Sequence, residues 1–574
     1  MIDDRASVAG ELSLPPDAPQ HVLAAVAYTR LHAKMLSRLR GAFALVVWDR
    51  RRRDGILAVD QLGARSLFYR RGAGSLVFAT EVRELLPLLQ TAPPPSEAAL
   101  VRWLVEGVQM PEETLLSGIE RLPGGHLLHL GGGTPRRERY WAPVYRTPLP
   151  LDSAASAASL RAAADRAVAR SCARGRPVGV LLSGGLDSTS VAAFAHGRRE
   201  RIAAYSATFP HHPRVDERDL IAERASLLGL TTGFVAFRQG GTLPATLRYL
   251  DTWRVPPASP NLFFHEPLLA LAGGEGITTM LDGQGGDELF GLSPYLAADR
   301  FLVGRLREVD RLLRLTAGSR AARRAAFRQV VLGGALPYRA HRLAAVARRR
   351  RHAPSWLTGV GAKLYGDGSA QWQWKAARAP RWWAHLAHVL TVGRQRVGVH
   401  DWLRHAFAQA GLKGAHPWLQ DVDLVETVLA LPPEHAWDAL YDRPLLREVL
   451  RGVLPDAIRL RAEKSYFNDV LGSAVHVADA AAIESLLTGR TEVSRYVRPE
   501  LGARLRALPP SRWGRRETWL LWRLVTLECW LRMHADPDFL GSARTVLALA
   551  EADVDVQPSM AASGGAPDRR GRSA

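Results

Sequence analysis

Cysteine is almost absent from this sequence. Its 574 residues include only two, Cys172 and Cys529, which lie far apart along the chain. So few thiols exclude a disulfide framework and a cysteine-rich zinc site. No apolar run approaches the ~18 to 20 residues that span a bilayer, and the first five residues lack the pattern of a leader peptide. We therefore expect a cytoplasmic protein without a membrane partner.

Lysine is also scarce, so the formal net charge of +20 comes almost entirely from arginine. The arginines are scattered among alanine and leucine, whereas a nucleic-acid binder usually gathers its basic residues in one patch. Clusters at 320–324 and 348–351 fit solvated helix faces, with a surface for a peptide substrate as the alternative. The composition thus predicts no nucleic-acid partner.

The chain is long enough for about two to four domains. Short apolar runs predict β-strands at 41–48, 55–60 and 75–78. A proline-rich segment at 140–150 then separates these strands from an alanine-rich helical pattern. We therefore place a β-rich front domain at residues 1–145.

In the next part of the chain, short apolar runs alternate with helical patterns, which is typical of a parallel sheet with helices on both faces. The predicted strands are residues 178–182, 202–208, 232–237 and 277–281. Beyond Glu288 the sequence is mainly helical. We assign residues 146–545 to this second domain, and we expect the Gly-, Ser-, Pro- and Arg-rich residues 546–574 to form a disordered tail.

The strand at 178–182 leads directly into Ser183-Gly184-Gly185-Leu186-Asp187-Ser188 and a helix start. Glycines let backbone N–H groups approach a phosphate, and serine hydroxyls and a helix N-terminus add donors. Asp187 would repel a bare phosphate, so its carboxylate fits a magnesium ligand that bridges to phosphate oxygens. An ordinary Gly-Gly turn with an N-cap serine is the alternative. The loop has neither the Walker A lysine nor the spacing of a dinucleotide fingerprint.

A second glycine-rich cluster, Asp282-Gly283-Gln284-Gly285-Gly286-Asp287, follows the strand at 277–281. In a parallel sheet the carboxyl ends of the strands meet at one edge, and ligands bind there. We therefore expect Asp187 and Asp287 to lie close together and to share one magnesium ion.

The two clusters together resemble the ATP-pyrophosphatase site of the asparagine synthetase (glutamine-hydrolysing, class B) family, which includes β-lactam synthetases and lasso-peptide macrolactam cyclases. Further similar segments are Leu122-Pro123-Gly124-Gly125-His126, Arg139-Tyr140-Trp141, Pro444-Leu445-Leu446-Arg447 and residues 461–467. The resemblance implies an α/β protein of two domains. An amidotransferase-like front domain with the αββα layers of N-terminal-nucleophile (Ntn) hydrolases would precede a doubly wound PP-loop sheet with a helical extension.

The resemblance also implies a ligase that forms C–N bonds, using ATP and Mg2+ to adenylate a carboxylate, release pyrophosphate and join the acyl group to an amine. The family's ATP contacts fall on Leu182, Ser183, Gly184, Gly185, Asp187, Ser188, Ala207, Asp282 and Gly283. Lys464 matches a lysine that steadies pyrophosphate, with a surface lysine as the alternative. The substrates would be a small-molecule or peptide carboxylate and an amine. A homodimer or a peptide-delivering protein would be the protein partner.

The sequence departs from the family at two places. A working glutaminase needs a cysteine directly after the initiator methionine, but this position is Ile2 and the front domain has no cysteine. Gln284 stands where the family places a glutamate or a tyrosine that helps to deprotonate the amine, and an amide takes up no proton at pH 7. Unless the true start lies elsewhere, we expect no glutaminase activity and a base at another position.

His400 and Asp401 lie roughly where β-lactam synthetases place the acidic partner of that tyrosine. We therefore take them, with Gln284 and Lys464, as the catalytic candidates, while a structural role of His400 and Asp401 is the alternative.

Three functions are open at this point: asparagine synthesis from aspartate, macrolactam or other amide formation in a specialised pathway, and a non-catalytic or RNA-modifying relative that keeps the nucleotide loop. The two departures favour an amine that is already part of the substrate.

Overall fold

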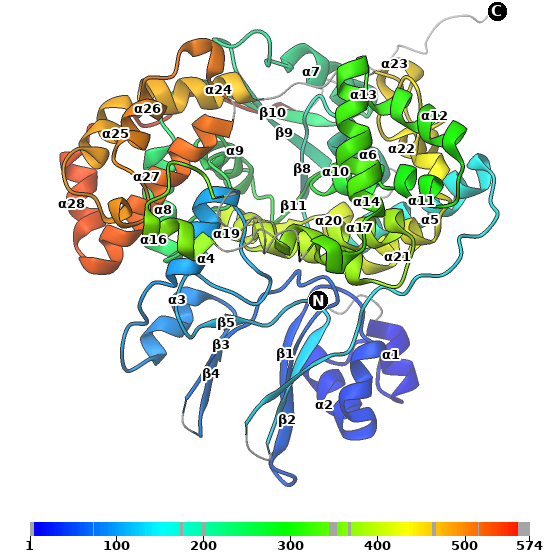
Figure 1. Ribbon diagram of the computed structural model, residues 1–574. Helices are drawn as coiled ribbons and strands as arrows, with labels where there is room; N and C mark the ends of the chain where they lie inside the picture. Colours follow the sequence, from blue (N-terminus) through cyan, green and yellow to red (C-terminus); the bar gives the residue numbers. More distant parts are fainter. Residues whose placement is uncertain are drawn as a thin grey trace, which may run out of the picture.

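The chain folds into two parts, a smaller β-rich part drawn below a larger α/β part in Figure 1. The structure is a computed structural model, and it describes residues 5–560 except 73, 132–133, 173–175, 197–201, 342, 344–352, 366–368, 462–466 and 515.

Two antiparallel sheets form the core of the smaller part, with strand orders β1-β2-β6-β7 and β4-β3-β5. Their strands are β1 (Ala44–Asp49), β2 (Asp54–Val59), β3 (Phe68–Arg71), β4 (Leu76–Ala79), β5 (Glu120–Arg121), β6 (His126–Leu130) and β7 (Arg136–Arg139). The three strands predicted for this part are confirmed as β1, β2 and β4. The prediction missed the other four because they are short, and because β7 consists of charged residues with no apolar alternation.

Alternate side chains of β2 show how this part is layered. Ile56 and Ala58 pack with residues of α1 (Arg5–Glu11) and α2 (Gln20–Leu31). Leu57 and Val59 face the other way and pack against Tyr69 of the second sheet. The outer face of the second sheet carries Phe68, which joins a core containing α3 (Val82–Leu85) and α4 (Glu97–Glu106). The order is therefore helix, sheet, sheet, helix.

A six-stranded sheet organises the larger part, with strand order β12-β11-β8-β9-β10-β13. Its strands are β8 (Val178–Leu181), β9 (Ile202–Thr208), β10 (Thr231–Gln239), β11 (Thr279–Leu281), β12 (Lys413–Ala415) and β13 (Asp553–Met560). All neighbouring pairs are parallel except β10 and β13. The predicted parallel sheet is thus confirmed, and so is the mixed α/β class.

Strand β13 corrects the expectation that the tail is disordered from residue 546 onward. Residues 553–560 pair antiparallel with the edge strand β10, for example Val235 with Val556. Asp and Val alternate over 553–556, so Val554 can pack on the core while the aspartates face outward. The paired segment covers backbone groups that β10 would otherwise leave open. Residues 561–574 lie outside the described residues.

Helices cover both faces of this sheet (Figure 1). One face packs on α5 (Ser153–Ser171), α6 (Leu186–His196) and α7 (Arg218–Leu227), whose buried residues share a core with Val180 and Ala204. The other face packs on α8 (Leu243–Trp253) and α9 (Leu262–Gly274), which share a core with Tyr205 and Met280.

The helical extension follows α10 (Gly286–Leu289). Its described α-helices are α11 (Leu296–Leu302), α12 (Leu306–Thr316), α13 (Arg320–Ala326), α14 (Gly333–Ala335), α16 (Gly359–Tyr365), α17 (Arg381–His388), α18 (Arg394–Val397), α19 (Val399–Gln409), α20 (Pro417–Gln420), α21 (Val422–Ala430), α22 (Pro444–Val449), α23 (Asp456–Arg459), α24 (Asn468–Ser473), α25 (Ala480–Leu487), α26 (Glu500–Arg506), α27 (Arg516–Ala535) and α28 (Phe539–Val546). Within the described ranges, no single helix is long and apolar enough to cross a membrane, although the bent pair Asn468–Ala478 and Ala480–Leu487 meets that criterion by length and composition.

Candidate active site

The two glycine-rich loops meet at the point where the strand order of the large sheet reverses. The chain leaves β8 for β9 and β10 on one side, and β11 then lies on the other side of β8. The loops that follow β8 and β11 therefore open onto one crevice at the carboxyl edge of the sheet. A Cβ atom on Gly283 would lie 2.5 Å from the Ser188 amide nitrogen, and one on Gly286 would lie 2.5 Å from Asp187 Cγ. Glycine is needed at both positions because the loops touch.

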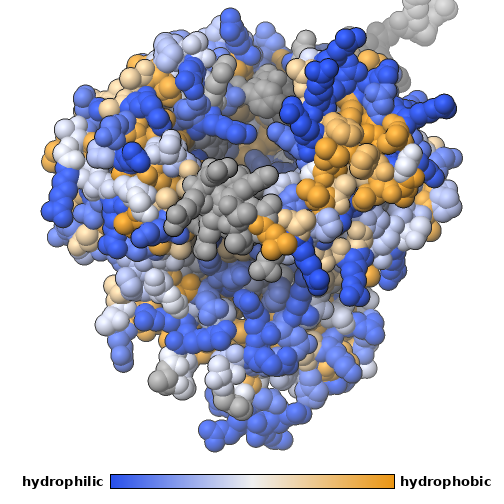
Figure 2. Space-filling view, viewed as in Figure 1, coloured by the Kyte–Doolittle hydropathy of each residue, from blue (hydrophilic) through white to orange (hydrophobic). Residues whose placement is uncertain are grey.

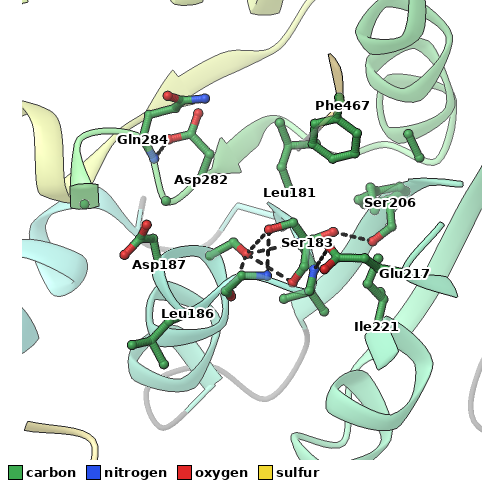
Figure 3. A pocket seen from close by; sticks show the side chains of 18 of the residues that line it. Leu181, Ser183, Leu186, Asp187, Ser206, Glu217, Ile221, Asp282, Gln284 and Phe467 are labelled. Atoms are coloured by element: carbon green, nitrogen blue, oxygen red, sulfur yellow. Dashed lines mark hydrogen bonds between the residues drawn. The ribbon is translucent and has the colours of Figure 1, made fainter. Parts of the chain in front are cut away.

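Hydrogen bonds within the first loop hold it curved around its own serines (Figure 3). The Ser183 amide donates to Ser188 Oγ at 3.0 Å, and the two serine hydroxyls lie 2.9 Å apart. The Gly185 amide donates to Ser183 Oγ at 3.2 Å. Ser206 Oγ, from the end of β9, donates to the Leu182 carbonyl at 2.6 Å. The loop is therefore fixed before any ligand binds, as a cradle for an anion requires.

One cavity of about 330 Å³ lies over these loops, a volume within the range of small-molecule sites. The structure brings every expected ATP contact to its wall: Leu182, Ser183, Gly184, Gly185, Asp187, Ser188, Ala207, Asp282 and Gly283. Gln284 and Asp287 line the same cavity. Residues from three segments of the chain, 182–188, 207 and 282–287, thus converge on one site.

Asp187 and Asp287 are brought together by an arginine. Arg443 Nη1 contacts Asp187 Oδ2 and lies 3.3 Å from Asp287 Oδ1. Burial alone would lower the pKa of Arg443, but the charges of Asp187, Asp442 and Asp287 raise it above its usual value. Its backbone is left-handed, with φ at 51°, a conformation that costs energy for a residue with a side chain. The fold thus holds a positive charge between the two carboxylates.

This carboxylate pair fits the expected magnesium ion in its chemistry. Both oxygens already face a shared cation, the guanidinium group of Arg443. In the part of the chain that the structure describes, no group of three or more His, Cys, Asp or Glu side chains could hold a metal. Magnesium does not need such a group, because it is commonly bound by one or two carboxylates together with phosphate oxygens and water.

Glu217 occupies the opposite side of the first loop (Figure 3). The Gly184 amide donates to Glu217 Oε2 at 2.9 Å, and Arg461 Nη1 lies 3.7 Å from Glu217 Oε1. A Cβ atom on Gly184 would lie 2.5 Å from both carboxylate oxygens of Glu217. The Glu217 carboxylate therefore already accepts the hydrogen bond that the Gly184 amide would donate to a phosphate oxygen.

Asp282 forms a buried pair with a histidine. Both of its carboxylate oxygens lie 2.9 Å from His416 Nδ1, and its Oδ1 also accepts the Gln284 amide at 3.1 Å. Asp282 lines the cavity and His416 lies behind it, 1% exposed. The nearby His265 also lines the cavity, and burial lowers its pKa to about 4, with Asp282 partly offsetting this effect. Near neutral pH the imidazole of His265 is therefore uncharged.

His400 and Asp401 lie elsewhere, at the contact between the two parts of the molecule. Asp401 accepts a 2.6 Å hydrogen bond from Ser66 Oγ and lies 2.9 Å from Arg121 Nη2, both in the front part. His400 and Asp401 line a small separate cavity there with Ser66 and Arg121. The structure therefore does not bring these two catalytic candidates to the loops.

Lys464 falls in 462–466, outside the described residues. The residues on either side, Arg461 and Phe467, both line the cavity over the loops. The sequence analysis missed Arg443, Arg224 and His416 as residues of this site. For two of them the sequence position was a signal, because Arg443 directly precedes the Pro444–Arg447 motif and His416 precedes Pro417-Trp418. Arg224 carries no such signal, because it resembles any surface arginine of a helix.

Comparison with known proteins agrees with this geometry. The family described as asparagine synthase matches residues 159–532, more than half of the chain. The chain belongs to the asparagine synthase family. A glutamine amidotransferase domain matches residues 20–141, which places this member's front part with that domain type.

Individual relatives of this asparagine synthase family member match it in part. A putative glutamine-hydrolysing asparagine synthetase of Mycobacterium bovis is 30% identical over 274 residues, covering 46% of this chain and 41% of that protein. Amidase chry2 of Gibberella zeae is 25% identical over 332 residues, covering 53% and 47%. Glutamine-hydrolysing asparagine synthetase 3 of Bacillus subtilis is 28% identical over 181 residues, covering 30% and 28%. The matched part therefore spans less than half the length of each relative.

Proposed function

We propose that this protein is an ATP-dependent amide ligase that adenylates a carboxylate and then joins the acyl group to an amine. One observation carries the proposal: the two glycine loops place a phosphate cradle, the Asp187 and Asp287 carboxylates and the Arg443 guanidinium in a single cavity. Relatives named as asparagine synthetases and as amidases support amide chemistry of this kind.

In the first step the substrate carboxylate attacks the α-phosphate of ATP, and pyrophosphate leaves. The amides and hydroxyls of the loop from Ser183 to Ser188 bind the phosphates, while Arg443, with Lys464 by family resemblance, offsets the charge on the leaving pyrophosphate. A magnesium ion between Asp187 and Asp287 would neutralise phosphate charge further.

In the second step an amine attacks the activated carbonyl carbon, AMP leaves, and the amine loses a proton. Gln284 cannot accept that proton, because an amide side chain does not ionise near pH 7. The Asp282 carboxylate lines the cavity, and His416 holds it in place at 2.9 Å. We assign proton uptake to Asp282, with His416 as its positioning residue.

The proposed nitrogen source is an amine of the substrate or one supplied from outside. The front part matches a glutamine amidotransferase domain, but no cysteine occurs before Cys172 in this sequence. We infer that residues 20–141, which contain no cysteine, do not by themselves release ammonia from glutamine. We also propose that the front part is of the Ntn-hydrolase type and that the large sheet is of the PP-loop type.

Two substrate classes fit. Aspartate with ammonia would give asparagine, whereas a peptide or other acid that carries its own amine would give a macrolactam or related amide. The lack of a proton acceptor at Gln284 and of a cysteine in the front part both favour the second class.

Exchange of labelled pyrophosphate into ATP tests the proposal, because adenylation is reversible before the amine attacks. We expect exchange that depends on an added acid: L-aspartate if the product is asparagine, or a peptide with a side-chain carboxylate if it is a cyclic or joined peptide. Absence of exchange with every acid would contradict the proposal and favour a nucleotide-binding relative without this activity.

Asp187→Ala should lower the exchange rate by about 100-fold or more, because the cavity loses one of the two carboxylates that face the shared cation. The matched control is Asp310→Ala, which removes an exposed aspartate paired with Arg314 on α12 and should leave exchange unchanged. If Asp187→Ala retains exchange at the level of that control, the assignment of Asp187 is wrong.

A further inference from the structure

Arg224 of α7 is an arginine in the wall of the cavity that the proposed reaction leaves unused. The residue is 2% exposed and lines the cavity over the loops. Its Nε and Nη1 atoms are buried and have no hydrogen-bond partner within the described structure. Burying polar groups without partners costs free energy, more so when the group carries charge. Such an arginine would be stabilised by a hydrogen-bond acceptor that reaches it only when a ligand is bound.

The candidate for that partner is Glu217, which lines the same cavity. Seven residues, about two helical turns, separate the two positions, so Glu217 at the N-cap and Arg224 in the last turn lie on one face of α7. Burial, together with the charge of Arg461, lowers the pKa of Arg224 to about 10, although the charges of Glu217 and Glu223 act in the opposite direction. Arg224 is therefore charged at neutral pH, and it interacts with the Glu217 carboxylate across the same cavity wall.

Glu217 holds a position that an incoming phosphate needs. Its carboxylate accepts the Gly184 amide at 2.9 Å and packs against the loop at the place where a Cβ of residue 184 would be. A bound polyphosphate would seek the same amide and would be repelled by the carboxylate at this distance. Polyphosphate and Glu217 therefore compete for one donor.

We infer that Glu217 closes the cradle when it is empty and moves to Arg224 when polyphosphate binds. In the moved position the Glu217 carboxylate accepts a hydrogen bond from one of the two unpartnered donors of Arg224, Nε or Nη1, and the Gly184 amide becomes available to a phosphate oxygen. The exchange replaces a carboxylate beside the phosphate by a neutral Glu217–Arg224 ion pair. Arg224 acts through Glu217 and is thus a positioning residue for pyrophosphate and for the phosphates of ATP. This inference rests on the proposed function.

Calorimetric titration of the full chain with inorganic pyrophosphate in the presence of Mg2+, and separately with MgATP, tests this exchange. Arg224→Met should weaken pyrophosphate binding about tenfold, since Glu217 then has nowhere to move. Glu217→Gln should tighten it several-fold, because a neutral amide neither repels phosphate nor binds the loop amide as strongly. Asp219→Asn, which neutralises an exposed aspartate on the same helix, is the matched control and should leave pyrophosphate affinity unchanged.

The double variant Glu217→Gln/Arg224→Met distinguishes this role from simple support of the fold. If Arg224 acts through Glu217, its loss should change pyrophosphate affinity by less than about threefold once Glu217 is neutral. An equal loss of affinity in both backgrounds would overturn the inference.

Should Arg224→Met fail to fold, Glu217→Gln still decides the matter, because affinity equal to or weaker than that of the unaltered protein would also overturn it. If the unaltered protein binds neither pyrophosphate nor MgATP, the proposed function itself fails. Binding that is indifferent to Glu217 and Arg224 overturns only the present inference.

Discussion

Pairs of acidic and basic side chains set the charge of the cavity wall. Four acidic residues line it in the described structure with a basic or histidine partner: Asp187 and Asp287 at Arg443, Glu217 at Arg461, and Asp282 at His416. Each pair places a negative group near the position where phosphate or a reacting amine would lie. The residue chemistry therefore suits a ligand that brings both phosphate and its own cation, as MgATP does.

Asp282→Asn should separate the two steps of the reaction. We expect ATP–pyrophosphate exchange to stay within about threefold, while amide formation falls by about 100-fold, because asparagine accepts no proton from the amine. The measurement compares exchange and amide product with the same acid and amine. An equal loss of both activities would instead make Asp282 a nucleotide contact.

Asp479 directly precedes α25, and its fully buried carboxylate contacts the start of α8. The Thr242 amide and hydroxyl each donate to it at 2.7 Å. Burial raises its pKa to about 7, although these hydrogen bonds act in the opposite direction. Since the folded-state pKa exceeds the unfolded value of about 4, its contribution to stability is fully present below pH 4 and is lost as pH rises to 7.

The difference in free energy of unfolding between the protein and Asp479→Asn should therefore decrease between pH 5 and pH 7, by at most about 1.4 kcal/mol per pH unit. Urea unfolding of both proteins at several pH values measures this difference. A difference that stays constant over the interval would show that Asp479 has no raised pKa.

At the scale of elements, the two edges of the large sheet differ. Strand β12 closes one edge with three residues, whereas β13 returns from the end of the described chain to close the other. Contacts anchor β13 beyond its ladder: Arg218 Nη2 donates to Gln557 Oε1 at 2.5 Å, and the Ser559 amide donates to Glu275 at 2.8 Å. The strand thus ties α7 and the end of α9 to β10.

Deleting residues 553–574 should lower the free energy of unfolding by about 2 kcal/mol or more, since β10 becomes an exposed edge and loses its ladder to β13. Thermal or urea unfolding provides the measurement. Deleting only 561–574 is the control and should have little effect. If both deletions behave alike, β13 does not stabilise the sheet.

At the scale of the whole molecule, buried ion pairs join the front part to the large part. Besides Asp401 with Arg121, Glu81 of the front part contacts Arg404 and lies 2.7 Å from His405 Nε2. These groups lie at the contact between the two parts, which Figure 1 draws one above the other. The position of His400 and Asp401 is therefore explained by assembly of the two parts.

Asp401→Ala should loosen that contact, because Arg121 and Arg404 would keep buried charges without this carboxylate. We expect a loss of about 3 kcal/mol in stability and faster proteolytic cleavage near residues 140–150, with the affinity for MgATP little changed. Limited proteolysis and nucleotide titration of the same variant measure both effects. Weaker MgATP binding with unchanged proteolysis would instead indicate that Asp401 acts at the nucleotide site.

At the scale of the whole molecule, the face shown in Figure 2 is mainly hydrophilic, apart from a hydrophobic area over the α11 to α14 region. Exposed apolar side chains there include Leu302, Val303, Leu306, Leu332 and Leu336.

The sequence by itself determined the class of the fold and the two loops of the site. Alternating apolar runs and helical patterns predict the parallel sheet, and the glycine clusters directly follow two of its strands, so both loops had to meet at one edge. These are local signals, carried by neighbours along the chain. They also limited the prediction, since short or charged strands such as β7 carry no such pattern.

Only the tertiary structure decided which distant groups join those loops. Arg443 reaches Asp187 from 256 positions away, and His416 reaches Asp282 from 134. Strand β13 joins β10 only after the whole helical extension, and Asp401 meets Ser66 instead of the loops. No local sequence pattern marks such partners. The path of the chain around the sheet decides which charged residues become neighbours, and the type of each residue does not.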